Sequence, residues 1–258
     1  MYLKRLASSL ALAALTSLSA TAQARVVCTA LADAATGKIL LSEGDCSSRV
    51  TPASTFKMAI SLMGYDAGFL KDEHTPNLPW KEGYLDWRED WKQSTDPQRW
   101  MKLSVVWFSQ QVTQTLGRKR VQHYVDVFDF GNRDISGDPG QNNSLTMSWI
   151  NSSLKISPLE QIAFQRKIAN RSLPVSVHAY DMTDKITLQE WRPDGWELHA
   201  KTGGAGGNGW YVGRASKDSR TIVFARLIHD DQPQDTPVGF RARDEFLPEM
   251  PALLAKIK

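Results

Sequence analysis

The sequence predicts an α+β fold, in which an antiparallel β-sheet flanked by helices is built from both ends of the chain and a helical lobe is inserted at about residues 60–190. Short strand-like runs with tight connections at the two ends predict the sheet. Apolar residues at helical spacing in the middle of the chain predict the lobe. The five expected strands lie at residues 26–33, 39–42, 196–201, 209–216 and 221–229.

The chain begins with a segment typical of a secretory signal peptide, residues 1–24. Lys4 and Arg5 precede an apolar stretch, and Ala22-Gln23-Ala24 forms a small-x-small cleavage site. The stretch is short and rich in serine for a membrane span, and an uncleaved N-terminal anchor is the alternative. We therefore expect a periplasmic or secreted protein without stable membrane association, in which residues 25–258 form a single domain.

The charge balance excludes some classes of partner. Cleavage after residue 24 removes two basic residues and leaves 29 basic against 28 acidic ones, a net charge of +1. Because no basic stripe is present, we expect no nucleic acid as partner. The five histidines are scattered, without the spacing of metal ligands, so we expect no metal. The sequence makes no prediction of the oligomeric state.

The chain contains two cysteines, Cys28 and Cys46. In an oxidising compartment such an isolated pair most simply forms a disulfide. The bond would close a short loop and contribute on the order of 3 kcal/mol. Two buried free thiols are the alternative.

A candidate nucleophile lies at the entry of an apolar helix that follows the first hairpin. Ser54 and Lys57 are three residues apart, so on a helix they share one face. A lysine can activate a serine only if desolvation lowers the pKa of its amine, and the apolar neighbours of Lys57 favour this. Ser152 and Lys155 have the same spacing, so the spacing alone does not choose between the two pairs.

The following segments predict the inserted lobe. Residues 69–99 are polar and rich in proline, as expected of a surface excursion anchored by tryptophans. Residues 101–116 have the spacing of one helix, which carries Ser104 on an apolar face. Ser157 and Glu160 form a capping box at the start of another helix. The tryptophans expected to anchor the excursion are Trp80, Trp87, Trp91 and Trp100.

The end of the chain contains one misleading motif. Gly204 to Gly209 matches the Gly-x-Gly-x-x-Gly pattern of dinucleotide sites, but that pattern requires a helix next, and a strand is expected to follow. We interpret it as a connection between strands. Residues 239–257 predict a terminal helix interrupted by prolines.

An acyl-transfer site needs a nucleophile, a base, a proton shuttle and cationic donors, and the chain offers candidates for each. In the order and at the separations found here, these segments resemble the class D (oxacillinase-type) serine β-lactamases over essentially the whole mature chain. The segments that carry the resemblance are Pro52-Ala53-Ser54-Thr55-Phe56-Lys57, Ser104-Val105-Val106, Phe130-Gly131-Asn132, Trp149 and Lys201-Thr202-Gly203.

The resemblance implies an acyl-enzyme on Ser54 and a general base at Lys57. The lysine would be carboxylated by carbon dioxide (N6-carboxylysine), so that the carbamate, and no other cofactor, serves as the base. Trp149 would donate to the carbamate, and Val105 and Ile150 would cover it. The carbamate forms only from a neutral amine, which an apolar pocket favours.

The resemblance also implies the groups around the substrate. Ser104, with Lys201 nearby, would protonate the departing nitrogen, and the backbone N–H groups of Ser54 and Gly204 would form the oxyanion hole. The candidates for substrate binding are Thr202, Phe130 and Arg241, with Arg243 as the alternative to Arg241. Most of the family has tyrosine at the position of Phe130, so no phenol is essential here, and we expect Phe130 to be a packing residue of the site wall.

The implied function is hydrolysis of the β-lactam ring of penicillin- and oxacillin-type antibiotics, which gives resistance. The missing Ser-Asp-Asn motif argues against the class A enzymes. A penicillin-binding transpeptidase or a β-lactam sensor domain, which is acylated without turnover, shares the motifs and is the alternative. A non-enzymatic periplasmic binding protein is the third hypothesis. Motifs alone predict no preference among cephalosporins and carbapenems.

Overall fold

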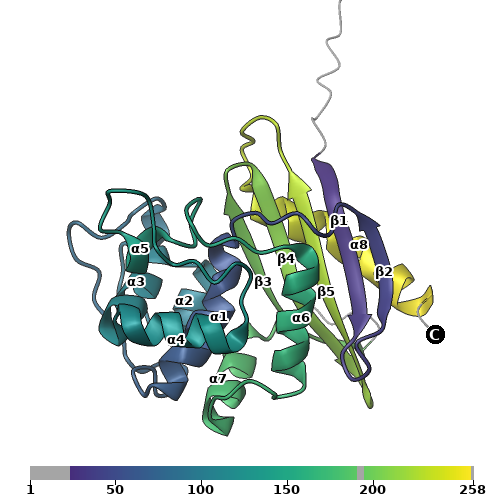
Figure 1. Cartoon of the computed structure of the whole chain (residues 1–258), viewed down its shortest axis with the longest axis horizontal. Coiled ribbons are helices and arrows are strands. Elements are labelled where there is room, and N and C mark those ends of the chain that lie inside the picture. Colours follow the sequence, from purple (N-terminus) through teal and green to yellow (C-terminus); the bar gives the residue numbers. More distant parts are fainter. Residues whose placement is uncertain (1–23, 191–194, 257–258) are drawn as a thin grey trace, which may run out of the picture.

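The computed structural model describes residues 24–190 and 195–256, so nearly all of the predicted signal peptide lies outside the described residues. Five antiparallel strands form one sheet in the order β2-β1-β5-β4-β3 (Figure 1). Strands from both ends of the chain meet where β1 pairs with β5, as the sequence predicts. The strands are β1 (Arg25–Asp33), β2 (Ile39–Gly44), β3 (Glu197–Ala205), β4 (Asn208–Lys217) and β5 (Arg220–His229).

Helices cover both faces of the sheet and form a lobe beside β3 (Figure 1). The terminal helix α8 (Val238–Lys256) packs on one face, which we call the outer face, and α6 (Pro158–Ala169) packs on the inner face. The lobe comprises η1 (Ala53–Phe56), α1 (Lys57–Asp66), η2 (Glu89–Trp91), α2 (Pro97–Leu103), α3 (Val106–Leu116), α4 (Arg118–Phe128), α5 (Ser144–Met147) and α7 (Val177–Thr187).

The alternation of side chains along the strands divides the core into two clusters. On β4, Trp210 and Val212 face the inner cluster, which continues into the helical lobe, whereas Tyr211 faces the outer cluster beneath α8. The fold is therefore the α+β arrangement that the sequence predicts. Because α6 belongs to the sheet layers, the insertion supplies part of the sheet's cover as well as the lobe.

Two local predictions on the inserted segment have different outcomes. The capping box is confirmed: the Ser157 hydroxyl accepts from the N–H of Glu160, and the Glu160 carboxylate accepts from the N–H of Ser157. The single helix at 101–116 is wrong, because the chain breaks at Ser104, whose φ of 59° ends α2 before α3 begins at Val106. Ser104 therefore lies in a turn between helices. Trp87 is 57% exposed, so the prediction that it anchors the surface excursion is wrong.

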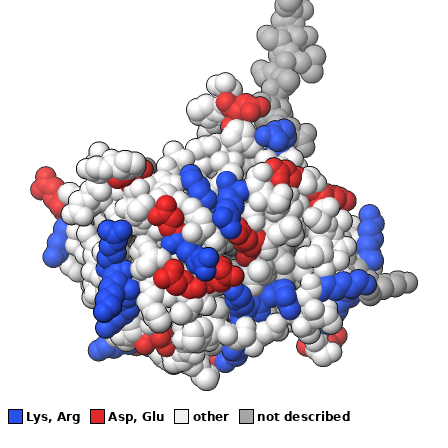
Figure 2. Space-filling view, in the orientation of Figure 1, with Lys and Arg blue, Asp and Glu red and all other residues white. Residues whose placement is uncertain are grey.

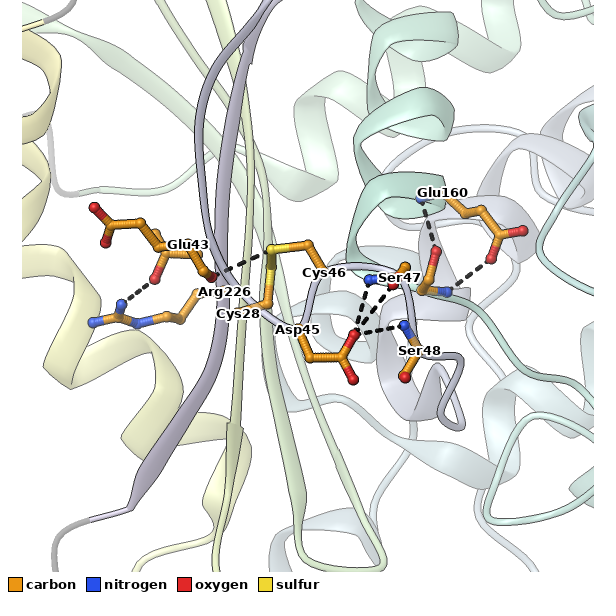
Figure 3. The surroundings of a disulfide bond; sticks show 10 residues. Cys28, Glu43, Asp45, Cys46, Ser47, Ser48, Glu160 and Arg226 are labelled. Atoms are coloured by element: carbon orange, nitrogen blue, oxygen red, sulfur yellow. Dashed lines mark hydrogen bonds between the residues drawn. A yellow bond between two sulfur atoms is a disulfide. The ribbon is translucent and has the colours of Figure 1, made fainter.

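A disulfide joins Cys28 on β1 to Cys46 just beyond β2, as predicted (Figure 3). Next to it, the Asp45 carboxylate accepts from the N–H groups of Ser47 and Ser48 and shapes the chain that leaves the hairpin. The bond ties the first strand to the segment that leads to Ser54. Among the described residues, no helix has the length and apolar character needed to cross a membrane.

Candidate active site

Ser54 lies in the short helix η1, on a backbone that is held in a conformation unusual for an L-residue. Ala53, immediately before it, has a φ of 48°, and the N–H of Thr55 bonds to the carbonyl of Pro52 at 3.1 Å. Non-glycine residues rarely adopt positive φ, and such positions often mark functional sites. Ser54 stays partly exposed while the residues on both sides of it are buried.

Lys57 begins α1 and is completely buried. Its Nζ lies 3.0 Å from the Oγ of Ser54. Burial lowers the pKa of Lys57 well below its usual value, and the nearby cation of Lys201 lowers it further. Both effects disfavour the charged ammonium, so the fold favours a neutral amine beside the serine.

Aromatic side chains pack around the start of α1. The Phe56 ring lies 5.0 Å from that of Phe130 and 5.7 Å from that of Trp149. The indole N–H of Trp149 is buried and has no hydrogen-bond partner in the described part of the chain. A buried donor without a partner is costly, and it marks a place where an acceptor would be stabilised.

Phe130 is fully buried and also packs edge-on against Phe164 at 5.0 Å. The predicted contact between Phe130 and a substrate therefore finds no support, because a side chain enclosed on all sides offers no surface to a ligand. Its position is that of a packing residue behind the site. Val105 is likewise buried, and Ile150 is partly buried against the same core.

The turn that carries Ser104 is fixed by hydrogen bonds from both sides. The N–H groups of Ser104 and Val105 both bond to the carbonyl of Trp100. The indole N–H of Trp91 bonds to the carbonyl of Leu103 at 3.1 Å. Ser104 itself has a positive φ, whereas beside Ser54 the positive φ belongs to Ala53, and Ser104 stays partly exposed.

The edge strand β3 brings Lys201, Thr202 and Gly204 toward the lobe. Along an antiparallel strand, the backbone groups of alternate residues point to the same side. The carbonyls of Leu198 and Ala200 accept from Gln189, on the side away from β4. The alternation therefore directs the backbone groups of Thr202 and Gly204 to this same open side.

Gly203 permits a close approach between β3 and η1. A Cβ at this position would lie 2.9 Å from the carbonyl oxygen of Pro52 and 3.0 Å from the nitrogen of Thr55. Only glycine fits at that separation. The contact brings Gly204, the next residue and an exposed one, beside the segment that carries Ser54.

Lys201 is buried on β3, and its Nζ donates to the carbonyl of Thr202 at 3.0 Å. Burial lowers the pKa of Lys201 to about 7, and the Arg243 guanidinium contributes to this. An amine with this pKa can hold or release a proton near neutral pH. The cation of Lys201 in turn disfavours charge on Lys57.

The two arginines of the first turns of α8 differ in their surroundings. Arg241 forms ion pairs with Asp230 at 2.6 Å and with Glu245 at 3.4 Å. Arg243 lines a cleft of about 930 Å³ together with Lys201 and Thr202. Arg243 pairs with the neighbouring Asp244 at 2.7 Å, so both arginines have carboxylate partners, but only Arg243 lines this cleft.

Thr51 is a residue that the sequence did not single out. Its hydroxyl donates to the carbonyl of Trp149 at 2.7 Å and accepts from the N–H of Asn151 at 2.9 Å. Its carbonyl accepts from the indole N–H of Trp210 on β4 at 2.9 Å. Thr51 thus ties the approach to Ser54 to the Trp149 segment and to the sheet, a role with no local sequence signal.

The second serine–lysine pair lies outside this arrangement. The Ser152 hydroxyl donates to the carboxylate of Asp138, and the backbone N–H of Lys155 donates to the side-chain oxygen of Asn132.

Within residues 24–190 and 195–256, no group of three or more His, Cys, Asp or Glu side chains is placed to hold a metal ion. Figure 2 shows basic and acidic side chains interspersed on the face it presents.

Comparisons with known proteins agree with one another. A family model described as the penicillin binding protein transpeptidase domain matches residues 27–249. β-Lactamase OXA-9 of Klebsiella pneumoniae is 42% identical over 241 residues, which cover 88% of this chain and 88% of that protein. β-Lactamase OXA-1 of Escherichia coli is 39% identical over 211 residues, 78% of this chain and 75% of that protein.

A solved structure extends the agreement to the fold. The crystal structure of the OXA-427 class D β-lactamase superposes with a TM-score of 0.85 at 44% sequence identity, covering 90% of this chain and 99% of that one. With similarity of this extent in both sequence and structure, the chain belongs to the class D serine β-lactamases.

Proposed function

We propose that this protein hydrolyses the β-lactam ring of penicillin- and oxacillin-type antibiotics through an acyl-enzyme on Ser54, and thereby gives resistance. The observation that carries the proposal is Lys57: a fully buried lysine, 3.0 Å from a partly exposed serine hydroxyl, with a pKa lowered well below its usual value. Membership of the class D β-lactamases supports the same activity.

The surroundings of Lys57 fit a carbamate made from carbon dioxide. Burial lowers the pKa of the Lys57 amine, which favours its neutral form, and the buried indole N–H of Trp149 has no partner in the described part of the chain. When formed, the carbamate would supply a base for the Ser54 proton and, later, for a water. Val105 and Ile150 contribute an apolar cover that limits access of other water.

The remaining residues act on the substrate during acylation. The Ser54 Oγ bonds to the lactam carbonyl carbon, the C–N bond breaks, and the nitrogen takes a proton from Ser104, which Lys201 re-protonates. The N–H groups of Ser54 and Gly204 stabilise the oxyanion, and loss of one such donor typically costs about 3 kcal/mol. Hydrolysis of the ester then releases Ser54.

Thr202 and an arginine of α8 bind the substrate carboxylate in this proposal. Arg243 lines the cleft with Thr202 and pairs with the exposed Asp244, whereas Arg241 pairs with the buried carboxylate of Asp230. Replacing each arginine by alanine separately distinguishes them, because loss of the carboxylate contact raises KM.

We further propose export through the signal peptide at residues 1–24, which the mass of the mature protein tests.

The test is oxacillin turnover by the purified protein with and without bicarbonate, together with its intact mass after mixing. We expect sustained hydrolysis that bicarbonate increases, and no adduct or turnover with Ser54→Ala. A stable adduct on Ser54 without turnover would instead establish a penicillin-binding or sensing protein. Turnover that ignores bicarbonate after exhaustive degassing would contradict the carbamate.

A further inference from the structure

A loop at residues 149–156, called here the Trp149 loop, lies between α5 and α6 outside the helices and strands. One end of the loop is fixed by backbone pairing, because Val50 and Ile156 exchange N–H···O bonds of 3.0 and 2.8 Å. The other end, which carries Trp149, is bonded to the side chain of Thr51. The two ends of the loop thus meet adjacent residues of the segment that leads to Ser54.

The Thr51 hydroxyl bridges two backbone groups of the Trp149 loop. It donates to the carbonyl of Trp149 at 2.7 Å and accepts from the N–H of Asn151 at 2.9 Å. Thr51 is only 2% exposed, so the carbonyl would be costly to leave without this donor. Removal of the hydroxyl would therefore free the loop to shift toward other partners or water.

The backbone of Thr51 is itself firmly placed. Its carbonyl accepts from the indole N–H of Trp210 at 2.9 Å, and Trp210 is a fully buried residue of β4. Because Val50 is paired as well, the hydroxyl extends from a backbone that is bonded on both sides. Thr51 thus transmits the position of the sheet to the Trp149 loop.

The Trp149 side chain, in contrast, is surrounded by apolar packing. Its ring centre lies 5.7 Å from that of Phe56, the residue before Lys57. Apolar contacts have little directionality, whereas a hydrogen bond constrains both distance and angle. The bond from Thr51 to the Trp149 carbonyl is therefore a contact that can fix where the indole N–H points.

The direction of that N–H matters for the chemistry proposed at Lys57. To form a carbamate, the Lys57 Nζ bonds to the carbon of carbon dioxide and releases one proton to water, which leaves a buried anion. A buried anion is costly without a donor, and the buried indole N–H of Trp149 has no partner in the described part of the chain. A residue that positions Trp149 can therefore change this equilibrium without touching Lys57.

We propose that Thr51 is a positioning residue that sets the affinity of Lys57 for carbon dioxide through the placement of Trp149. The inference rests on the proposed carbamate. It gives Thr51 a role in maintaining the base and none in binding substrate. Loss of the hydroxyl should accordingly be reversed by added bicarbonate, whereas a loss of structure alone should not.

Thr51→Val tests the proposal, because it keeps the shape of the side chain and removes the hydroxyl. Oxacillin turnover is measured against bicarbonate concentration at one fixed pH, since pH sets the proportion of carbon dioxide. We expect the half-saturating bicarbonate concentration to rise about fivefold, the size of one neutral hydrogen bond. At saturating bicarbonate, kcat should return to within about twofold of wild type. An unchanged half-saturating concentration, or turnover that bicarbonate does not restore, overturns the proposal.

Thr51→Ala also removes the hydroxyl and should give the same rise, so it serves if Thr51→Val does not fold. Thr51→Ser keeps the hydroxyl and should behave as wild type. Thr113→Val is the matched control, since Thr113 is fully buried and its hydroxyl donates to the carbonyl of Leu145 in another segment. It should lower the melting temperature and leave the bicarbonate requirement unchanged. A rise in Thr113→Val equal to that in Thr51→Val would overturn the specific role of Thr51.

Carbon-13 NMR with labelled bicarbonate measures the carbamate without substrate. Wild type should show a carbamate resonance that Lys57→Met lacks, and Thr51→Val should need about fivefold more bicarbonate to reach half its intensity. Absence of the resonance in wild type would refute the carbamate itself. A resonance with the same titration in wild type and Thr51→Val would refute only the positioning role, so the two failures are distinguishable.

Discussion

Two buried basic side chains on opposite sides of the sheet have very different surroundings. On the outer side, Arg226 is 4% exposed, donates to both oxygens of Glu249 at 2.7 Å and to Thr29, and lies 5.3 Å from the centre of the Phe246 ring. On the inner side, Lys57 is fully buried with a hydroxyl at 3.0 Å and a second lysine nearby.

The difference shows how burial can serve structure or chemistry. A buried cation that has a carboxylate partner forms an ion pair, and breaking such a pair destabilises the fold. A buried lysine with no carboxylate partner is driven toward the neutral amine, at a cost in stability. A strongly shifted pKa is typical of functional sites. We therefore expect a change at Lys57 to lower turnover and a change at the Arg226 ion pair to lower stability.

The largest expected effect is that of Lys57→Met. The variant keeps roughly the length of the side chain and removes the amine, so we expect oxacillin turnover to fall about 10³-fold or more, because Ser54 loses the general base that activates it. The melting temperature should hold or rise, because an uncompensated buried amine is removed. Steady-state kinetics and thermal unfolding measure the two quantities.

Lys155→Met is the control for that variant, because it changes the lysine of the second serine–lysine pair. It should keep turnover within about twofold. Wild-type turnover by Lys57→Met would contradict the proposed base, and a large loss in Lys155→Met would show that the wrong pair had been assigned.

The pH dependence of the free energy of unfolding tests the same contrast at Lys201, the second buried lysine of the site. Its folded pKa of about 7 lies below the usual 10.5, so between these values the unfolded chain binds a proton that the folded protein lacks. The free energy of unfolding therefore rises with pH through this window, by at most about 1.4 kcal/mol per pH unit for one group, and its contribution is constant below pH 7.

Urea unfolding of wild type and Lys201→Met at pH 7.5, 8.5 and 9.5 isolates this contribution. Lys57 is present in both proteins, and Lys201 also lowers its pKa, so the difference between their slopes reports Lys201 together with its effect on Lys57. We expect the wild-type slope to be steeper. Parallel slopes would mean that the ammonium of Lys201 is as stable in the folded protein as in water.

The parts of the fold that the sequence predicts depend on local signals. The hairpin at Gly37, the strands and the capping box at Ser157 each follow from residues close together in the chain. The break at Ser104 does not, because no glycine or proline marks it and the apolar spacing continues across it. It depends on contacts with Trp91, which is distant in sequence.

The candidate site divides in the same way. Ser54 and Lys57 are adjacent on one helix turn, so spacing alone brings them together. The approach of β3 to η1 at Gly203 and the tie through Thr51 are tertiary contacts between distant segments. The choice between Arg241 and Arg243 likewise depends on Asp230, which approaches Arg241 only in the folded chain.

The smallest expected effect is on the outer face, where Glu249→Gln weakens the partner of Arg226. Since Glu249 is half exposed, solvent screens the pair and the loss should be about 1 kcal/mol, or roughly 2–4 °C in melting temperature. Turnover should not change, because the Phe246 ring and Thr29 still hold the guanidinium away from Ser54. A loss of turnover without a loss of stability would show that the two sides of the sheet are coupled. The distinction between Arg226 as a structural side chain and Lys57 as a chemical one would then fail.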